Sequence, residues 1–299
     1  MNAPHYKPIS ISFSRFSQIR EWLFLFALVG LAFCCPTAHG QASAAEPSTP
    51  SAPAAANPSP ASPEMEAFQR ARLSVDKFFE QATNVVCTEN VSQSVVAKNG
   101  KVDYREDSVF DYQLQTSPNS GSLKLVESRD TRKAAFRDSS RTLLITNGFT
   151  AMLLIMHPSY ESSFIFDTAG EESADGVTYV KINFKAIPGA SSPAALQLRG
   201  HNYPLPLSGT IWIEPQSGAV AKLVASLDSS LSDLGLKGIR SEIHYAMIRF
   251  HDPDESYWMP ISAIIDVETP RQHWRNIHRF TAYKRFRATI HVEDLEKKP

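Results

Sequence analysis

A run of cations and histidines near the end of the chain is the densest group of chemically capable side chains, RQHWRNIHRFTAYKRFRATIHVED from residue 271 onward. Alternate residues of a strand point to opposite faces, so the run predicts two different faces. The cationic face would carry Arg271, His273, Arg275, Arg279, Arg285 and Arg287. The apolar face would carry Trp274, His278, Phe280, Phe286, Ile290 and Val292. The run is long for one straight strand, so we expect a bend or bulge near Tyr283 and Lys284.

The cationic face has two interpretations. It binds phosphate-bearing partners such as lipid head groups or nucleic acid, or it is a solvated outer face whose arginines keep the sheet soluble. The aromatic rings lie on the opposite face and cannot stack bases beside the cations, which favours the solvated face and argues against nucleic acid. The net charge of −1 creates no global field toward polyanions either.

The histidines and the cysteines give no metal site. His278, on the apolar face, is either a polar group inside a ligand groove or, as we favour, a hydrogen-bonded core histidine. His273 and His278 lie on opposite faces, and no other spacing of His, Cys or carboxylates fits a metal. Cys87 has no cation near it in sequence to lower the pKa of its thiol, so we expect a buried small hydrophobe. We expect no metal and no cofactor.

Motifs for covalent or nucleotide chemistry are not found in the sequence. There is no G-x-S-x-G elbow, no P-loop and no G-x-G-x-x-G. GASSPA, residues 189–194, has serines without a strand–turn–helix context, and DPDES, residues 252–256, lacks the glycine and distant glutamate of a calcium loop. We therefore expect no catalytic residue and no enzyme, although folding can bring distant side chains together.

The chain after residue 84 mostly shows the alternation of antiparallel strands. Asn99-Gly100, Asp175-Gly176 and residues 216–218 are turn sequences between such segments, as in a series of β-hairpins. Ten or eleven strands are expected, paired mostly with their sequence neighbours. Such a meander with one apolar face must close on itself or be covered.

Two helices are available as covers. Residues 63–82 carry an apolar stripe at helical spacing, with Pro63 in the first turn. GFTAMLLIMHP, residues 148–158, is apolar on every side, yet far shorter than the ~20 residues of a membrane span, so it must be buried all round. The sequence thus predicts a mainly β (α+β) fold. It would be a large antiparallel meander curled into a half-open barrel, with an N-terminal helix and a short apolar lid or plug helix.

The first 62 residues are expected to lie outside the folded domain. Residues 1–40 have the pattern of a secretory signal peptide, with an apolar core at 22–35 and cleavage near Gly40; a retained membrane anchor is the alternative. Residues 41–62 read as a Pro/Ala/Ser-rich disordered linker, and residues 63–299 as one domain. The protein is therefore expected to be exported, periplasmic or extracellular, and to touch a membrane only through an uncleaved signal segment.

Five stretches, taken in order, resemble secreted bacterial proteins related to the outer-membrane lipoprotein-sorting (LolA-like) carriers. They are NVVCTEN, GFTAMLLIMHPSY, GTIWIEPQSGAVAKL, YWMP and HRFTAYKRF, within residues 66–292. The resemblance implies a half-open β-barrel around a hydrophobic groove, with helices as a lid, in which carriers of that family hold lipoprotein acyl chains. The long Pro/Ala tether and the basic C-terminal run depart from the carriers.

These features lead to two functional hypotheses. The first is an exported envelope protein that shelters a hydrophobic ligand, a lipid or an acylated chain, in a groove under the helix lid. The groove would be lined by Phe149, Leu153, Met156, Trp274, His278 and Phe280. The alternative is a non-enzymatic structural or interaction module with a fully packed core, whose surface contacts an envelope protein. Free volume beside residues 149–156 would separate the two.

Overall fold

The computed structural model describes residues 9–12, 62–81, 84–117, 124–133, 144–146, 148–198, 201–251 and 254–285. Three segments discussed above lie outside these ranges: the apolar stretch at 22–35, the linker up to residue 61, and the C-terminal run from Phe286 onward. The predicted signal peptide and linker therefore stay predictions.

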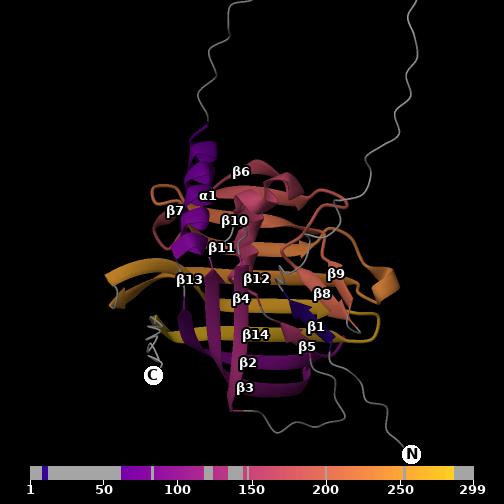
Figure 1. Cartoon of the computed structure of the whole chain (residues 1–299). Coiled ribbons are helices and arrows are strands. Elements are labelled where there is room, and N and C mark those ends of the chain that lie inside the picture. Colours follow the sequence, from indigo (N-terminus) through magenta and orange to yellow (C-terminus); the bar gives the residue numbers. More distant parts are fainter. Residues whose placement is uncertain are drawn as a thin grey trace, which may run out of the picture. The chain divides into compact units, whose positions relative to one another are not determined.

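One antiparallel sheet of ten strands forms the body of the structure (Figure 1). Its strands are β2 (Val85–Val96), β3 (Val102–Ser117), β4 (Lys124–Lys133), β6 (Phe164–Ala174), β7 (Val177–Ala186), β10 (Leu207–Glu214), β11 (Ala219–Leu227), β12 (Gly238–His251), β13 (Asp254–Glu268) and β14 (His273–Arg285). Their spatial order is β4-β3-β2-β14-β13-β12-β11-β10-β7-β6. The two edges are β4 and β6, so the described strands form an open sheet, as predicted for a half-open barrel.

The hairpins that the turn sequences predict are present. Asn99-Gly100 lies between β2 and β3, and Asp175-Gly176 joins β6 to β7. Asp175 and Gly176 both have positive φ, 52° and 79°. This backbone suits a type I′ turn, whose twist matches that of the strands it joins.

Strictly sequential pairing is wrong at two junctions. Strand β2 pairs with β14, the last described strand, and β7 pairs with β10 instead of the strand that follows it in the chain. A turn sequence specifies the strand directly after it, whereas the neighbour on the other edge is chosen by packing of distant segments. The strand that follows α1 and the last described strand are therefore side by side.

Strand β14 has the two faces predicted from its parity. Its buried residues are Trp274, Asn276, His278 and Phe280. Arg275 and Arg279 are exposed on the other face. A β-bulge interrupts pairing with β2 between Thr281 and Lys284, where the sequence predicts one. The bulge re-aims the end of the strand, because it inserts unpaired residues on one side of the ladder.

A second, smaller sheet has the order β5-β1-β8-β9. Its strands are β1 (Ile9–Ser12), β5 (Leu144–Thr146), β8 (Ala195–Leu198) and β9 (His201–Pro204). The sequence places residues 1–40 outside the fold, whereas β1 pairs here with β5 and β8. The reason is local: ISIS alternates apolar and polar residues, the period of a strand. Cleavage near Gly40 would remove this strand.

Helix α1 spans Pro63–Gln81, within one residue of the prediction. The Ser62 hydroxyl accepts a hydrogen bond from the Met65 N–H, and acidic residues occupy the first turn, so its start is capped. Its buried stripe comprises Ala67, Phe68, Ala71, Val75, Phe78 and Phe79. Figure 1 shows α1 beside β6, β7, β10 and β11, which it contacts. A separate short 3-10 turn, η3 (Ser232–Leu234), precedes β12.

The apolar segment at residues 148–156, called the plug below, is enclosed as predicted. Every residue from Ala151 to Met156 is at most 3% exposed. It is not one helix, however, but a 3-10 helix, η1 (Ala151–Met156), followed by a second, η2 (Pro158–Ser163). His157 breaks them with extended backbone, the conformation favoured before proline.

Gly218 allows α1 to pack on the turn between β10 and β11. Its φ is +71°, and an added Cβ would lie 2.6 Å from the carbonyl carbon of Arg70. Gly218→Ala should lower the free energy of unfolding by about 2–4 kcal/mol, from strain plus displacement of the helix. Gly176→Ala is the control, because φ there is +79° with nothing near the added Cβ, so only strain applies. Equal losses of unfolding free energy for the two variants in urea would contradict the close approach of α1 to Gly218.

Candidate ligand-binding site

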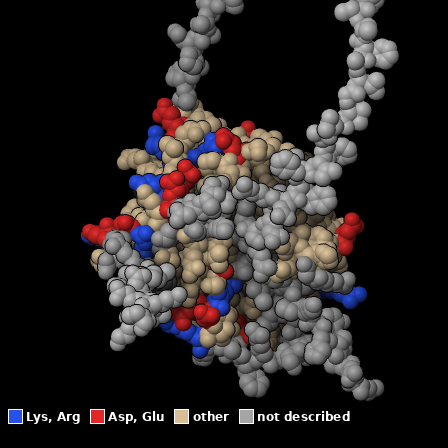
Figure 2. Space-filling model, viewed as in Figure 1, with Lys and Arg blue, Asp and Glu red and all other residues tan. Residues whose placement is uncertain are grey.

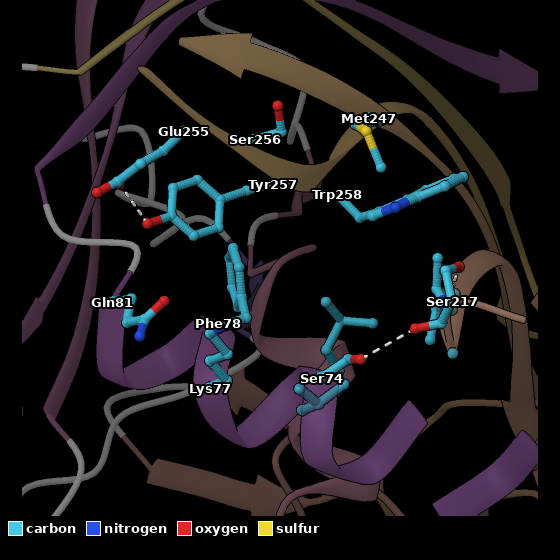
Figure 3. Close-up of a pocket in the computed structure, with 15 residues that line it drawn as sticks. Ser74, Lys77, Phe78, Gln81, Ser217, Met247, Glu255, Ser256, Tyr257 and Trp258 are labelled. Atoms are coloured by element: carbon cyan, nitrogen blue, oxygen red, sulfur yellow. Dashed lines mark hydrogen bonds between the residues drawn. The ribbon is translucent and has the colours of Figure 1, made fainter. Parts of the chain in front are cut away.

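A pocket of about 410 Å³ lies between α1, the β10–β11 turn and the ends of β12 and β13 (Figure 3). Its apolar lining comprises Val75, Phe78, Leu153, Ala219, Val220, Met247, Tyr257 and Trp258. Its polar lining comprises Ser74, Lys77, Gln81, Ser217, Glu255 and Ser256. Ligand pockets in proteins are mostly apolar, with a few polar groups, and measure ~300–1,000 Å³, so size and lining are both suitable.

Helix α1 and two paired strands place these side chains. Ser74, Phe78 and Gln81 are three or four residues apart and share one side of the helix. Met247 of β12 is the register partner of Trp258 of β13, and in Figure 3 their side chains lie across the cavity from the helix. Met247 is 57% exposed, so the pocket opens to solvent on this side.

One end of the pocket is fixed by an aromatic pair and an ion pair. Phe78 meets Tyr257 edge to face, with ring centroids 6.0 Å apart. The Tyr257 hydroxyl donates to Glu255 at 2.5 Å, and Arg285 forms a salt bridge with the same carboxylate. Arg285 also donates to the carbonyl of Gln81 at 2.7 Å. Strand β14 therefore ties the end of α1 to β13.

Only one of the six residues predicted to line a groove touches this pocket. Leu153 lines it. The other five, Phe149, Met156, Trp274, His278 and Phe280, are buried in the core, with at most 6% of each exposed. Parity assigns the inner face of β14 correctly, but the plug covers that face: Phe149 contacts His278 and Phe280 ring to ring. The free volume lies at the edge of the plug, where strand parity gives no signal.

A buried polar network lies on the inner face of the sheet, beneath the plug. Glu89 of β2 forms a bidentate salt bridge with Arg129 of β4, in which Arg129 Nη2 lies 2.6 Å from Glu89 Oε1. His278 Nδ1 lies 2.8 Å from Glu89 Oε1, and its Nε2 lies 2.7 Å from Thr146 Oγ1. Asn276 donates to the same hydroxyl at 3.1 Å. The structure thus makes His278 a hydrogen-bonded core histidine.

The protonation of this network follows from its surroundings. Burial lowers the pKa of His278, so the ring is neutral. Burial alone would raise the pKa of Glu89, but Arg129 and His278 outweigh it and hold that pKa below its ordinary value. The carboxylate is therefore ionised, and the arrangement is consistent with Nδ1–H donating to Glu89 while Nε2 accepts from Thr146.

Thr146, His278 and Glu89 together have the order hydroxyl–imidazole–carboxylate that activates a nucleophile in hydrolases. Each of the three is at most 1% exposed, and none of them lines the pocket beside α1. A nucleophile sealed from substrate does no chemistry. The network instead holds the backbone just before the plug in place, because Arg129 also donates to the Thr146 carbonyl at 2.6 Å.

Polar side chains also bind the backbone of the plug itself. Tyr245 donates to the Phe149 carbonyl at 3.0 Å, and the Ala151 N–H donates to Glu127 at 3.2 Å. The carboxyl group of Glu127 is fully buried, and burial outweighs the opposing effects of Tyr112, Arg129 and the Ala151 N–H on its pKa. Burial accordingly raises the pKa of Glu127 to about 7. The plug is thus fastened at several backbone groups.

The remaining candidate residues have structural explanations. Burial raises the pKa of the Cys87 thiol to about 12, as expected for an inert buried cysteine. On the outer face, Arg275 and His273 both pair with Asp266. On the side of the molecule where α1 lies, seen in Figure 2, basic and acidic side chains are likewise interspersed. A partly neutralised, solvated strand face is thus favoured over a phosphate-binding stripe.

The side chains and helices of the described ranges also bear on two other kinds of site. Within these ranges, no three His, Cys, Asp or Glu side chains converge as they would around a metal ion. No helix in the same ranges is both long enough and apolar enough to cross a bilayer.

The fold is similar to those of several solved structures. A DUF1329 family protein from Desulfovibrio piger matches with a TM-score of 0.35 at 10% identity, over 79% of this chain and 95% of that one. A LolA superfamily protein from Nitrosomonas europaea matches with a TM-score of 0.32 at 12% identity, over 74% and 94%. A putative outer membrane lipoprotein-sorting protein domain from Vibrio parahaemolyticus matches with a TM-score of 0.33 at 10% identity, over 78% and 97%.

Two of these solved structures belong, by their descriptions, to the LolA-related proteins that the sequence resembles. No family model matches the chain, and no curated protein does. The site is accordingly assigned from the residues of this chain alone.

The salt bridge between Glu89 and Arg129 can be tested by a double-mutant cycle. Arg129→Met should lower the free energy of unfolding by about 3–5 kcal/mol, because it leaves a buried carboxylate unpaired. Glu89→Gln combined with Arg129→Met should cost less than the sum of the single changes, since no lone charge remains. Arg275→Met, in an exposed pair, should change stability by less than about 1 kcal/mol. Additive effects in the cycle would rule out the coupling.

Glu127 should make stability depend on pH in a defined direction. Its folded pKa, about 7, exceeds the ordinary 4.5, so its contribution is complete below pH 4.5 and is lost as the pH rises through 7. Glu127→Gln stays uncharged, so its stability relative to the unaltered protein should increase by about 1–3 kcal/mol between pH 5 and pH 8. Chemical denaturation at both values measures this, with exposed Glu268→Gln as control. A pH-independent difference would refute the burial of a titrating carboxyl.

Proposed function

We propose that this protein is an exported envelope protein that binds a hydrophobic ligand, a lipid or an acylated chain, in the pocket between α1 and the ends of β12 and β13. The observation that carries the proposal is the 410 Å³ of open volume with walls formed by Phe78, Met247, Tyr257 and Trp258. When an apolar ligand enters, the large apolar side chains around the pocket gain contacts and lose exposed area. Each Å² of apolar surface removed from water contributes ~25 cal/mol of favourable free energy.

Binding is favoured over catalysis by what surrounds the titratable groups. The hydroxyl–imidazole–carboxylate arrangement is sealed under the plug, and the pocket itself contains one carboxylate, Glu255, already paired with Arg285. The other charged lining residue, Lys77, has no unpaired carboxylate and no imidazole beside it in the lining with which to share proton transfer. Export follows from the signal-peptide pattern of residues 1–40.

The second candidate is an interaction module with a packed core. It is supported by the plug, whose residues fill the inner face of the sheet where the groove was expected. In that case the envelope partner would be a protein bound at the surface. The two candidates differ in whether the pocket beside Leu153 takes up a ligand.

Ligand binding can be tested on the full chain with a fluorescent fatty acid. We expect saturable binding, and lipid in solvent extracts of the purified protein by mass spectrometry. Ser74→Trp should weaken binding at least tenfold, because the indole would fill the opening of the pocket beside α1. Leu73→Trp is its control, since Leu73 is the adjacent helix residue, 70% exposed and not part of the lining. If no saturable binding and no extracted lipid were observed, the ligand-binding proposal would be wrong and the interaction module with a packed core would be favoured.

A further inference from the structure

We infer that the ligand is a single-chain amphiphile with an anionic head group, whose chain lies in the pocket and whose head is bound at Lys77 of α1. This inference rests on the proposed function and specifies the class of ligand. It is carried by three features of the pocket: its volume, the position of its polar side chains, and the charge that remains after internal pairing.

The volume limits the number of chains. A cavity of ~150 Å³ holds one benzene molecule, so a pocket of about 410 Å³ has room for roughly three times that content. One acyl chain, partly outside, is of that size, whereas two or three chains side by side are not. The space that further chains would need is filled by the plug, whose residues from Ala151 to Met156 are at most 3% exposed.

The lining is itself amphiphilic. Phe78, Met247 and Trp258 provide apolar walls, while Ser74, Lys77 and Gln81 lie along the helix side that borders the pocket (Figure 3). A ligand matching this lining has an apolar body and a polar end. A wholly apolar ligand would leave the hydrogen-bonding groups of α1 without new partners.

The unpaired charge at the pocket is positive. Lys77 and Glu255 are its two charged lining residues. Glu255 is neutralised by Arg285 and also accepts from Tyr257. Lys77 makes no salt bridge or hydrogen bond with another described residue, and the carboxylate of Glu80, three residues further along the helix, does not approach within salt-bridge distance of it. An anionic head therefore meets an unpaired ammonium group.

The end of α1 does not oppose this charge. The C-terminal carbonyls of a helix carry partial negative charge and would repel an anion. Here the guanidinium of Arg285 donates to the Gln81 carbonyl at 2.7 Å and offsets that charge. Asp76, beside Lys77 in sequence, lies 3.2 Å from His157 Nε2 beside the plug. The nearby acidic groups are thus directed elsewhere.

The test compares ligands that share one chain and differ in the head. Competition with the fluorescent fatty acid on the full chain would use palmitate, hexadecyl phosphate, hexadecanol and hexadecyltrimethylammonium. We expect both anions to bind at least tenfold more tightly than the alcohol and the cation, with the difference shrinking at high salt. A preference for the phosphate would indicate a lysophospholipid, and a preference for the carboxylate a free fatty acid; either supports the inference.

Variants at Lys77 identify the head-group site. Lys77→Gln should reduce the affinity for both anions about tenfold and leave hexadecanol unchanged, whereas Lys77→Arg should retain anion binding. Lys237→Gln, at an exposed lysine away from the pocket, controls for net charge. Two outcomes would overturn the inference and leave the proposed function standing. One is equal affinity for all four ligands, and the other is an affinity of Lys77→Gln for the anions equal to that of the unaltered protein. Tighter binding of a diacyl phospholipid would also overturn it, and binding of none would overturn both.

Discussion

An apolar segment without a polar side has to be enclosed, and enclosing the plug buries its backbone as well. A short 3-10 helix satisfies few of its own N–H and C=O groups, and a buried group without a partner destabilises the fold. The sheet supplies partners: Tyr245 for the Phe149 carbonyl, Glu127 for the Ala151 N–H and Arg129 for the Thr146 carbonyl. Two of the ionic groups in this otherwise apolar interior, Glu127 and Arg129, thus bind backbone within the plug or just before it.

The same enclosure determines where free volume remains. Helix α1, with nineteen residues, covers only part of the ten-stranded sheet, and the plug packs beside it on the inner face. Where α1 ends, Arg285 holds Gln81 and Glu255 together, so the helix end stays close to β13. The pocket is the space left between this fixed corner, the plug and the exposed ends of β12 and β13. Its size is thus a consequence of how the plug is packed.

Local features of this fold were predictable and long-range ones were not. The α1 stripe, the Asp175-Gly176 turn and the two faces of β14 all depend on residues a few positions apart. The burial of Glu89 could have been predicted from the sequence, because it shares the inward parity of Val85 and Cys87 in β2 and is thus a carboxylate on an apolar face. Its contact with His278 could not, because the β2–β14 ladder is set by packing of strands far apart in the sequence. Arg129 reaches Glu89 through strands that follow one another in the chain, β2, β3 and β4.

The buried network and the pocket meet in the plug, and this connection bears on what the protein can hold. Leu153 lines the pocket, while Ala151, two residues earlier, is bound to Glu127. A plug held through its own Phe149 and Ala151 backbone, and through Thr146 just before it, cannot withdraw unless several buried hydrogen bonds break together, each worth about 1 kcal/mol or more. The pocket therefore keeps its dimensions while the network is intact. Under the proposed function, the pocket would therefore hold one slender ligand at the edge of the plug, and a larger cargo would first require the network to open.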